Sequence, residues 1–338
     1  MIPKSIIRLK PLNLNDFPMN SFKQKIQAFI SAGSIKLLIR FLVTVSIFAL
    51  ILHSINVHQI WKILHQANLG LLVVAFFMQF GSTTVSAYRW QLIMQNMNFG
   101  QCFSFYWRSY FKAMFFNQGL PTSIGGDALR VLDVAGHGFR KRDALYGVML
   151  DRIAGLAALI LLNLIAYAFN PDLLPVQVYY LTLLLMAGGL LGIVTITSLA
   201  RLRWLDAYVR LAIVNTMSER LYQAFLTHRI LLLASSLLIP LLAMLGFFAT
   251  GWALGLRYDL TTYFVIVPPA ILLTVIPVSL AGWGVREGAL VALFSFIGAD
   301  KATVLTMSIL YGLTLIIVSL PGFLIYLGGR QRLLSTSQ

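Results

Sequence analysis

The stretch Leu120-Pro-Thr-Ser-Ile-Gly-Gly-Asp-Ala-Leu-Arg130 returns further along the chain as Ile276-Pro-Val-Ser-Leu-Ala-Gly-Trp-Gly-Val-Arg286. Both copies follow the pattern P-x-S-[I/L]-[G/A]-G-x-x-x-R, and both interrupt a hydrophobic segment. Because proline and glycine weaken helices, each copy predicts a helix break with one arginine just beyond it. Duplicated breaks at membrane depth are typical of a lipid-embedded site built from two halves.

The composition indicates an integral membrane protein. Hydrophobic residues make up 59% of the chain and charged residues 11%, against about a quarter charged in an ordinary soluble domain. The 26 Lys and Arg against 11 Asp and Glu are concentrated in tails and loops, which is typical of membrane orientation rather than nucleic-acid binding. The single cysteine, Cys102, excludes an internal disulfide. We expect neither a metal site nor a cofactor, since no tight set of ligand residues occurs.

Hydrophobic runs predict the membrane-spanning segments, each near the roughly 20 apolar residues that cross a bilayer. Two further stretches, 102–135 and 262–298, each contain one copy of the motif, and their Pro and Gly make them poor simple spans. We therefore predict an all-α polytopic membrane protein with about six full transmembrane helices and two re-entrant or broken helical hairpins. The predicted spans are 37–56, 68–90, 144–168, 176–199, 230–254 and 303–327.

Loop charges predict the orientation of the chain. Basic residues concentrate in both tails and in two loops, which places these segments in the cytoplasm. Three full spans separate the two motifs, so the hairpins would enter from opposite faces and the halves would form an inverted repeat. The alternative is that each motif only kinks an ordinary helix. The predicted divisions are a tail at 1–35, a transmembrane domain at 36–328 with halves of about 36–168 and 176–327, an amphipathic cytoplasmic linker at 201–229, and a tail at 329–338.

The charged residues near the breaks are candidates for a functional site. An ionisable group inside a membrane costs at least ~2.5 kcal/mol, which favours a function for Arg130 and Arg286. Asp127 lies one turn from Arg130, where it could pair with that arginine, cap the new helix or bind a ligand. Glu287 follows Arg286 directly and is expected to point elsewhere on the helix. Asp151 either faces a central cavity or forms a structural ion pair.

Three motifs in order carry a resemblance to a known family. They are N-x-x-x-P-x-x-x-G-G-D-x-x-R at 117–130, the Asp151-Arg152 pair, and P-x-x-x-x-G-x-G-x-R-E-G at 277–288; Arg89-Trp90 upstream adds an Arg-Trp pattern. Together they resemble the transmembrane, flippase-like domain of lysylphosphatidylglycerol synthetases and its stand-alone relatives. The resemblance covers about residues 36 to 328. One departure is Ala281, which stands where the first copy has Gly125.

The resemblance implies a lipid translocator of the bacterial inner membrane that moves or binds a phospholipid, or a related lipid with an anionic headgroup, by alternating access. Full-length synthetases carry a soluble domain that transfers an aminoacyl group from tRNA to lipid. The sequence ends soon after the last predicted span, so that activity is not carried over and we expect no enzyme. The alternatives are a non-enzymatic accessory subunit partnered with a lipid-modifying or glycolipid-modifying enzyme, a small-anion secondary transporter, or a membrane-embedded transferase.

In this hypothesis, the two motif arginines and the free amides at helix starts after Gly126 and Gly284 bind the headgroup, because helix N-termini favour anions. Membrane lipids are the expected partners, and Pro121 and Pro277 are the expected helix breaks. The predicted substrate-binding residues are Asn117, Ser123, Gly125, Gly126, Asp127, Arg130, Asp151, Gly282, Gly284, Arg286 and Glu287.

Overall fold

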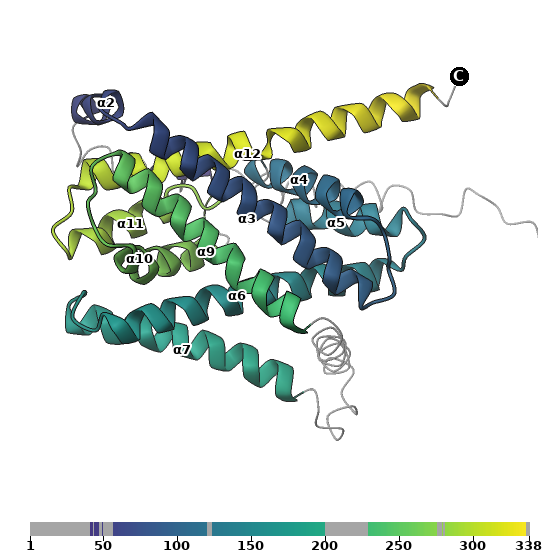
Figure 1. Cartoon of the computed structure of the whole chain (residues 1–338), viewed down its shortest axis with the longest axis horizontal. Helices are drawn as coiled ribbons and strands as arrows, with labels where there is room; N and C mark the ends of the chain where they lie inside the picture. The colour runs from purple at the N-terminus through teal and green to yellow at the C-terminus, as the bar shows by residue number, and fades with distance from the viewer. Residues whose placement is uncertain are drawn as a thin grey trace, which may run out of the picture.

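The computed structural model describes residues 57–119, 124–199, 229–275, 279 and 281–335, with a few positions between 41 and 49. Within these ranges every regular element is an α-helix (Figure 1). The predicted tail at 1–35, nearly all of the span 37–56 and most of the linker 201–229 lie outside the described residues, as do Pro121, Ser123 and Pro277. The described helices are α2 (Val57–His65), α3 (Leu69–Gln95), α4 (Phe103–Gly119), α5 (Ile124–Ala135), α6 (Lys141–Phe169), α7 (Val176–Leu199), α9 (Arg229–Ala253), α10 (Leu260–Leu273), α11 (Val285–Ser295) and α12 (Lys301–Ser335).

Four described helices are long and apolar enough to cross a membrane: Leu69–Gln95, Lys141–Phe169, Ile230–Ala253 and Lys301–Gly328. They correspond to the predicted spans 68–90, 144–168, 230–254 and 303–327. Helix α7 forms at the predicted span 176–199. Large apolar side chains on these helices are exposed, for example Leu184 and Leu185 on α7. Such surface is stable against lipid tails. The protein is therefore a polytopic, multi-pass membrane protein.

Both motif stretches are broken helices. The first consists of α4 and α5, and the second of α10 and α11, with the motif between the two helices each time. In the second copy the backbone turns through positive φ at Ala281 (48°), Gly282 (81°) and Gly284 (85°). Glycine adopts this conformation at little cost, which explains two of the motif's glycines. The described residues show the second break, whereas the first falls at residues 120–123, which lie outside them, and re-entry into a membrane stays a prediction.

Helices α3 and α9 lie side by side at the centre of the molecule and run in opposite directions (Figure 1). The backbone N–H of Asn68, at the start of α3, donates to the carbonyl of Ala253 at the end of α9 at 2.9 Å. Near their middles the Ser82 hydroxyl donates to the Ile239 carbonyl at 3.0 Å. These two central helices are thus antiparallel along their length.

The remaining helix contacts occur in matching pairs. Helix α4 packs on α5 as α10 packs on α11, α5 on α6 as α11 on α12, and α4 on α12 as α10 on α6. Local contacts repeat too: the Tyr106 hydroxyl donates to the Phe99 carbonyl at 2.6 Å, and the Tyr263 hydroxyl donates to the Leu256 carbonyl at 3.1 Å. These contacts in the first part of the chain thus have counterparts in the second, and the inverted repeat itself stays a prediction.

Two large apolar clusters form the core of the described residues. Trp90, Tyr106 and Leu150 belong to one cluster, while Phe247 and Phe294 belong to the other. On α3, the buried polar residues from Gln79 to Arg89 precede the apolar residues that join the first cluster, which are Trp90, Leu92, Ile93 and Met94. The fold therefore leaves a polar stretch of α3 beside an apolar core.

Candidate functional site

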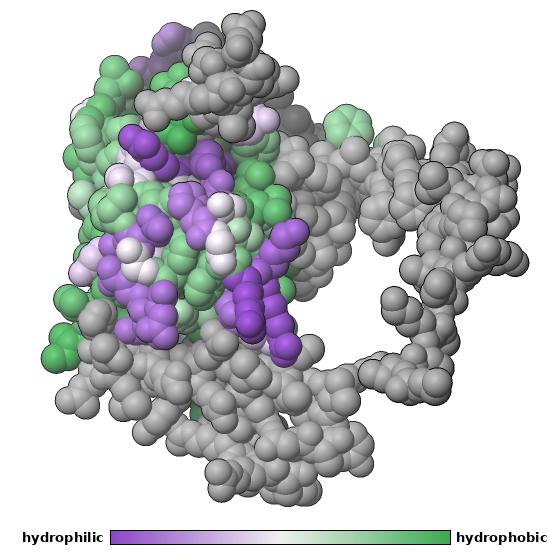
Figure 2. Space-filling model, turned by 90° about the vertical axis from the view of Figure 1, so that its right-hand side faces the viewer, coloured by the Kyte–Doolittle hydropathy of each residue, from purple (hydrophilic) through white to green (hydrophobic). Residues whose placement is uncertain are grey.

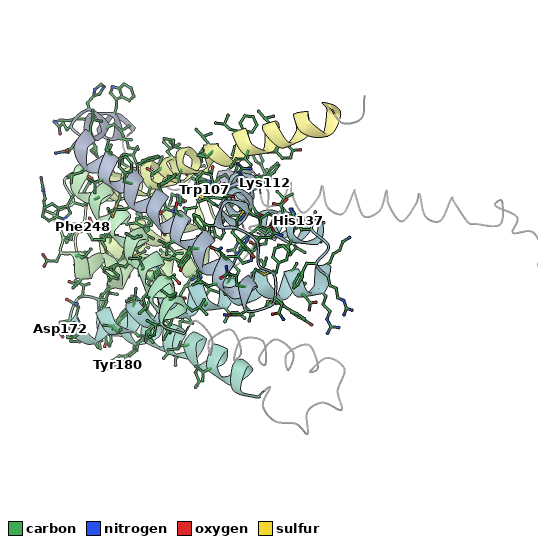
Figure 3. The ribbon with its side chains drawn as sticks, turned by 45° about the vertical axis from the view of Figure 1, so that its right-hand side comes forward. Trp107, Lys112, His137, Asp172, Tyr180 and Phe248 are labelled. Atoms are coloured by element: carbon green, nitrogen blue, oxygen red, sulfur yellow. The ribbon has the colours of Figure 1, made fainter. Side chains whose placement is uncertain are left out.

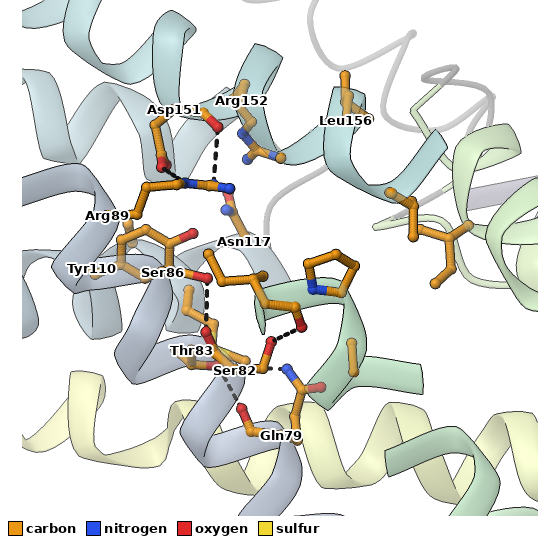
Figure 4. Close-up of a pocket in the computed structure, with 18 of the residues that line it drawn as sticks. Gln79, Ser82, Thr83, Ser86, Arg89, Tyr110, Asn117, Asp151, Arg152 and Leu156 are labelled. Atoms are coloured by element: carbon orange, nitrogen blue, oxygen red, sulfur yellow. Dashed lines mark hydrogen bonds and ion pairs between the residues drawn. The ribbon is translucent and has the colours of Figure 1, made fainter. Parts of the chain in front are cut away.

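A stripe of buried polar side chains follows one face of α3. Its members are three or four residues apart, or multiples of that spacing, so they share one side of the helix. Inside a membrane-spanning helix such a stripe needs polar partners or a water-filled cavity. The stripe consists of Gln79, Ser82, Thr83, Ser86 and Arg89 (Figure 4).

The stripe ends in a network of five charged side chains from α3, α5 and α6. Asp151 accepts hydrogen bonds from Arg89 Nε and from Arg130 Nη2, each at 2.8 Å. Asp127 accepts from Arg152 Nε at 2.8 Å and from Arg130 Nη1 at 3.3 Å. Arg130 is thus the central member, held between both aspartates.

Packing fixes both buried guanidinium groups. Arg130 lies over the rings of Trp90 and Tyr110, 4.2 Å and 4.6 Å from their centroids, where the ring quadrupole attracts a cation. Arg89 lies beside Gly155, and a Cβ there would come within 3.1 Å of Arg89 Nη2. A glycine at this position on α6 therefore gives Arg89 its space.

These groups line a cavity of about 350 Å³. Its walls come from α3, α4, α5, α6 and α9, and Figure 4 shows Arg89, Asp151 and Arg152 at one end and Gln79 at the other. The charged lining residues are Arg89, Arg130, Arg152, Asp127 and Asp151. Three arginines against two aspartates leave a net charge of +1.

Two guanidinium nitrogens of the residues that line this cavity lack a hydrogen-bond partner in the described part of the chain. They are Arg89 Nη1 and Arg130 Nε, and both are buried. Their residues are only 3% and 2% exposed. A buried donor without a partner costs about 1–3 kcal/mol, and more when charged. An anion in the cavity would satisfy both donors.

A model of the lysylphosphatidylglycerol synthase transmembrane region matches residues 37–322. The chain belongs to this family. The match concerns the transmembrane region rather than the catalytic synthase domain. A search of the curated proteins found no match to this chain. Family membership supports a membrane protein with a lipid-related function, and the resemblance expected from the motifs is confirmed.

In this family member, the first copy of the motif lies at the cavity. Asn117, Asp127 and Arg130 line it together with Asp151. Helix α5 already begins at Ile124, so Gly125 and Gly126 lie in its first turn rather than before it. The Gly126 amide donates to Asn117 Oδ1 at 2.8 Å. The ligand groups offered here are therefore side chains rather than a free helix N-terminus.

Gly126 has a packing role. A Cβ at this position would lie 2.1 Å from the Ala113 carbonyl oxygen and 2.6 Å from Asn117 Oδ1. Only glycine therefore lets α5 approach α4 this closely. The close approach brings Asp127 and Arg130 to the cavity.

The second copy builds a different, closed site. Arg286 Nη2 lies 2.6 Å from Glu287 Oε1 and also donates to the Ser308 carbonyl at 3.1 Å. Glu287, which is 0% exposed, accepts from the Gly284 amide at 2.6 Å. Neither Arg286 nor Glu287 lines the cavity of the first copy.

The second copy corrects one prediction from the sequence. Glu287 was expected to point away from Arg286 because adjacent residues diverge by about 100° around a helix. The long arginine side chain instead folds back to its neighbour, and both bond to Ser308 on α12. The amide of Gly284, the residue before α11, has Glu287 as its partner. Of the other predicted positions, Gly282 forms the turn before α11, and neighbouring Ser279 is buried.

Sequence reasoning missed the position of Arg89, which appeared only as part of the family resemblance. The signal was present in the span 68–90, where polar residues recur at helical spacing and end at this arginine. No group of three potential metal-ligating residues occurs among the residues that the structure describes.

Proposed function

We propose that the protein binds and translocates a lipid with an anionic headgroup, and that the phosphate occupies the cavity beside Arg89 and Arg130. The observation that carries this proposal is the pair of buried, unpartnered guanidinium nitrogens in a cavity of net charge +1. Arginine donors match the oxygens of a phosphate and bind it strongly in a low-dielectric site. Membership of a lipid-related membrane family supports the same ligand class.

The size of the cavity suits a headgroup rather than a whole lipid. A space of about 350 Å³ lies at the lower end of the range for small-molecule sites. The acyl chains would therefore stay in the bilayer, against the exposed apolar side chains of the outer helices. In this proposal the stripe from Arg89 to Gln79 offers hydrogen bonds to the headgroup as it moves along α3.

The inverted repeat supplies a route between leaflets. Proteins with inverted repeats alternate access by moving one half against the other around a central site. Here the first-copy arginine lines a cavity while the second-copy arginine is neutralised by Glu287. We propose that this structure is one of two states, and that the second copy opens when the first closes. The halves would lie in a bacterial inner membrane with both termini in the cytoplasm.

Leaflet exchange in liposomes tests the proposal. Purified protein would be reconstituted with a fluorescent phosphatidylglycerol, and the labelled lipid in the outer leaflet would be followed by chemical quenching. We expect faster exchange than in empty liposomes, and about tenfold slower exchange for Arg130→Gln, because a charge-assisted bond contributes about 1.5–3 kcal/mol. Arg257→Gln, in an exposed loop outside the cavity, should behave like the wild type.

Wild-type exchange equal to that of empty liposomes would contradict translocation. Saturable binding without exchange would instead support the accessory-subunit alternative, in which a partner enzyme uses the bound lipid. If Arg130→Gln and Arg257→Gln slowed leaflet exchange by the same factor, the result would contradict the headgroup site.

The proposed membrane topology has a separate test. Single cysteines replacing Ser123 and Ser279 in a Cys102→Ser background would be labelled with an impermeant maleimide from either side of sealed vesicles. We expect the two positions to be labelled preferentially from opposite sides. Equal labelling of both positions from the cytoplasmic side alone would contradict the inverted insertion of the hairpins.

A further inference from the structure

Helix α4 separates two polar cavities. Residues on one of its faces, Tyr110, Ala113, Met114 and Asn117, line the cavity described above. Residues of its first turns, including Arg108, Ser109 and Lys112, line a second cavity of about 610 Å³ between α4, α5 and α12. We call this second cavity the α4–α12 groove. The two cavities share no lining residue.

The α4–α12 groove carries a net positive charge. Arg108 and Lys112 contribute two positive charges, and Asp133 contributes one negative charge, which leaves +1 with His137 neutral. Lys112 is held in place by Asp133, with its Nζ 2.7 Å from Oδ2. Figure 3 places Lys112 and His137 at the same end of the molecule. Arg108 and Lys112 lie on consecutive turns of one helix, and two neighbouring basic side chains suit a phosphate group.

A second observation points to a polar ligand. Ser109 lines the groove, is only 1% exposed, and its hydroxyl has no hydrogen-bond partner in the described part of the chain. Ser109 lies between the two basic residues in the sequence. A phosphate oxygen in the groove would give this buried hydroxyl the partner that it lacks.

The surroundings indicate a lipid rather than a soluble anion. Ile325 and Gly328 of α12 line the groove, and on the same stretch of α12 Leu324 and Leu327 are 67% and 41% exposed. Figure 2, which faces this end of the molecule, shows hydrophilic and hydrophobic surface side by side. A phospholipid meets both requirements, since its phosphate fits the basic wall and its chains cover exposed leucines.

We propose that the α4–α12 groove is a second lipid site, which binds the phosphate of an anionic phospholipid through Arg108, Ser109 and Lys112. This site is separate from the cavity at Arg130 and does not depend on translocation. Its position on the outer side of α4 leaves a bound lipid in contact with the bilayer.

The only cysteine of the chain, Cys102, reports on this site. It is exposed and lines the groove, so a lipid phosphate bound there would shield its thiol. The full-length protein would be placed in nanodiscs of neutral lipid alone or with phosphatidylglycerol, and the rate of maleimide labelling measured. At about 80% occupancy the labelling rate should fall about fivefold.

Anionic lipid also lowers local hydroxide and slows any surface thiol, so a matched cysteine is needed. Gly100→Cys in a Cys102→Ser background serves, because Gly100 is exposed, lies outside the groove lining and has open space where a Cβ would extend. We expect this thiol to slow much less than Cys102. Arg108→Gln and Lys112→Gln should each restore fast labelling of Cys102, whereas Arg130→Gln should leave its protection intact.

Equal slowing at both thiols, or full protection in both groove variants, would overturn the proposal. Equal protection by inorganic phosphate in neutral nanodiscs would assign the groove to a soluble anion instead. Because no exchange is measured, these results stand whether or not the protein translocates lipid.

Discussion

Replacement of Asp151 by asparagine should destabilise the protein strongly. Among the described residues, Asp151 is the only carboxylate bonded to Arg89, and it also bonds to Arg130, both at 2.8 Å, with all three side chains at most 4% exposed. The change removes one negative charge, so the cavity charge rises from +1 to +2. Removal of one partner from a buried ion pair costs about 3–5 kcal/mol, and asparagine puts an NH2 donor where one of the two carboxylate oxygens accepts from an arginine.

Thermal unfolding in detergent micelles measures this effect. For a protein of this size, about 3–5 kcal/mol should lower Tm by about 4–7 °C. Asp172→Asn is the matched control, because Asp172 is exposed in the loop before α7. Arg89→Met combined with Asp151→Leu should recover part of the loss, since it removes the unpaired charge of Arg89 together with its partner. An Asp151→Asn protein that unfolds at the wild-type temperature would refute the buried network.

Three further substitutions test the second copy of the motif, the first copy and the polar stripe of α3 in turn. Glu287→Gln should lower Tm, since the buried carboxylate holds both Arg286 and the start of α11; an unchanged Tm would contradict this role. Gly126→Ala should slow leaflet exchange because the added Cβ would strike the Ala113 carbonyl. Gly138→Ala is not a suitable control, although Gly138 has open space around it, because its φ is positive. Gln79→Leu should slow exchange with headgroup affinity unchanged; a parallel loss of affinity would place Gln79 at the binding site instead.

The sequence was sufficient to predict five of the long described helices. Runs of apolar residues marked α3, α6, α7, α9 and α12, and proline with glycine marked both interruptions. These signals are local, because a spanning segment must be apolar over its whole length and a break needs residues with special backbone preferences.

The pairing of charges could not be predicted in the same way. Arg89 and Asp151 are far apart in the sequence and meet only because α3 packs on α6. The two motif arginines have equivalent positions in the repeat, yet Arg130 reaches aspartates on two helices whereas Arg286 turns back to Glu287. Side-chain direction depends on which neighbours are within reach, and a motif does not encode this. The duplicated sequence predicted one site built from both copies, whereas in the structure Arg130 lines the cavity and Arg286 pairs with Glu287 outside it.

The most direct test is equilibrium binding of a short-chain phosphatidylglycerol to the detergent-solubilised protein by titration calorimetry. The control ligand is a diacylglycerol of the same chain length, which lacks the phosphate. In a Lys112→Gln background, which removes binding in the α4–α12 groove, we expect saturable binding of the phospholipid only, weakened about tenfold or more by Arg130→Gln and unchanged by Arg257→Gln. In that background, equal affinity for phosphatidylglycerol with and without Arg130→Gln, or equal binding of both ligands, would contradict a headgroup site at Arg130.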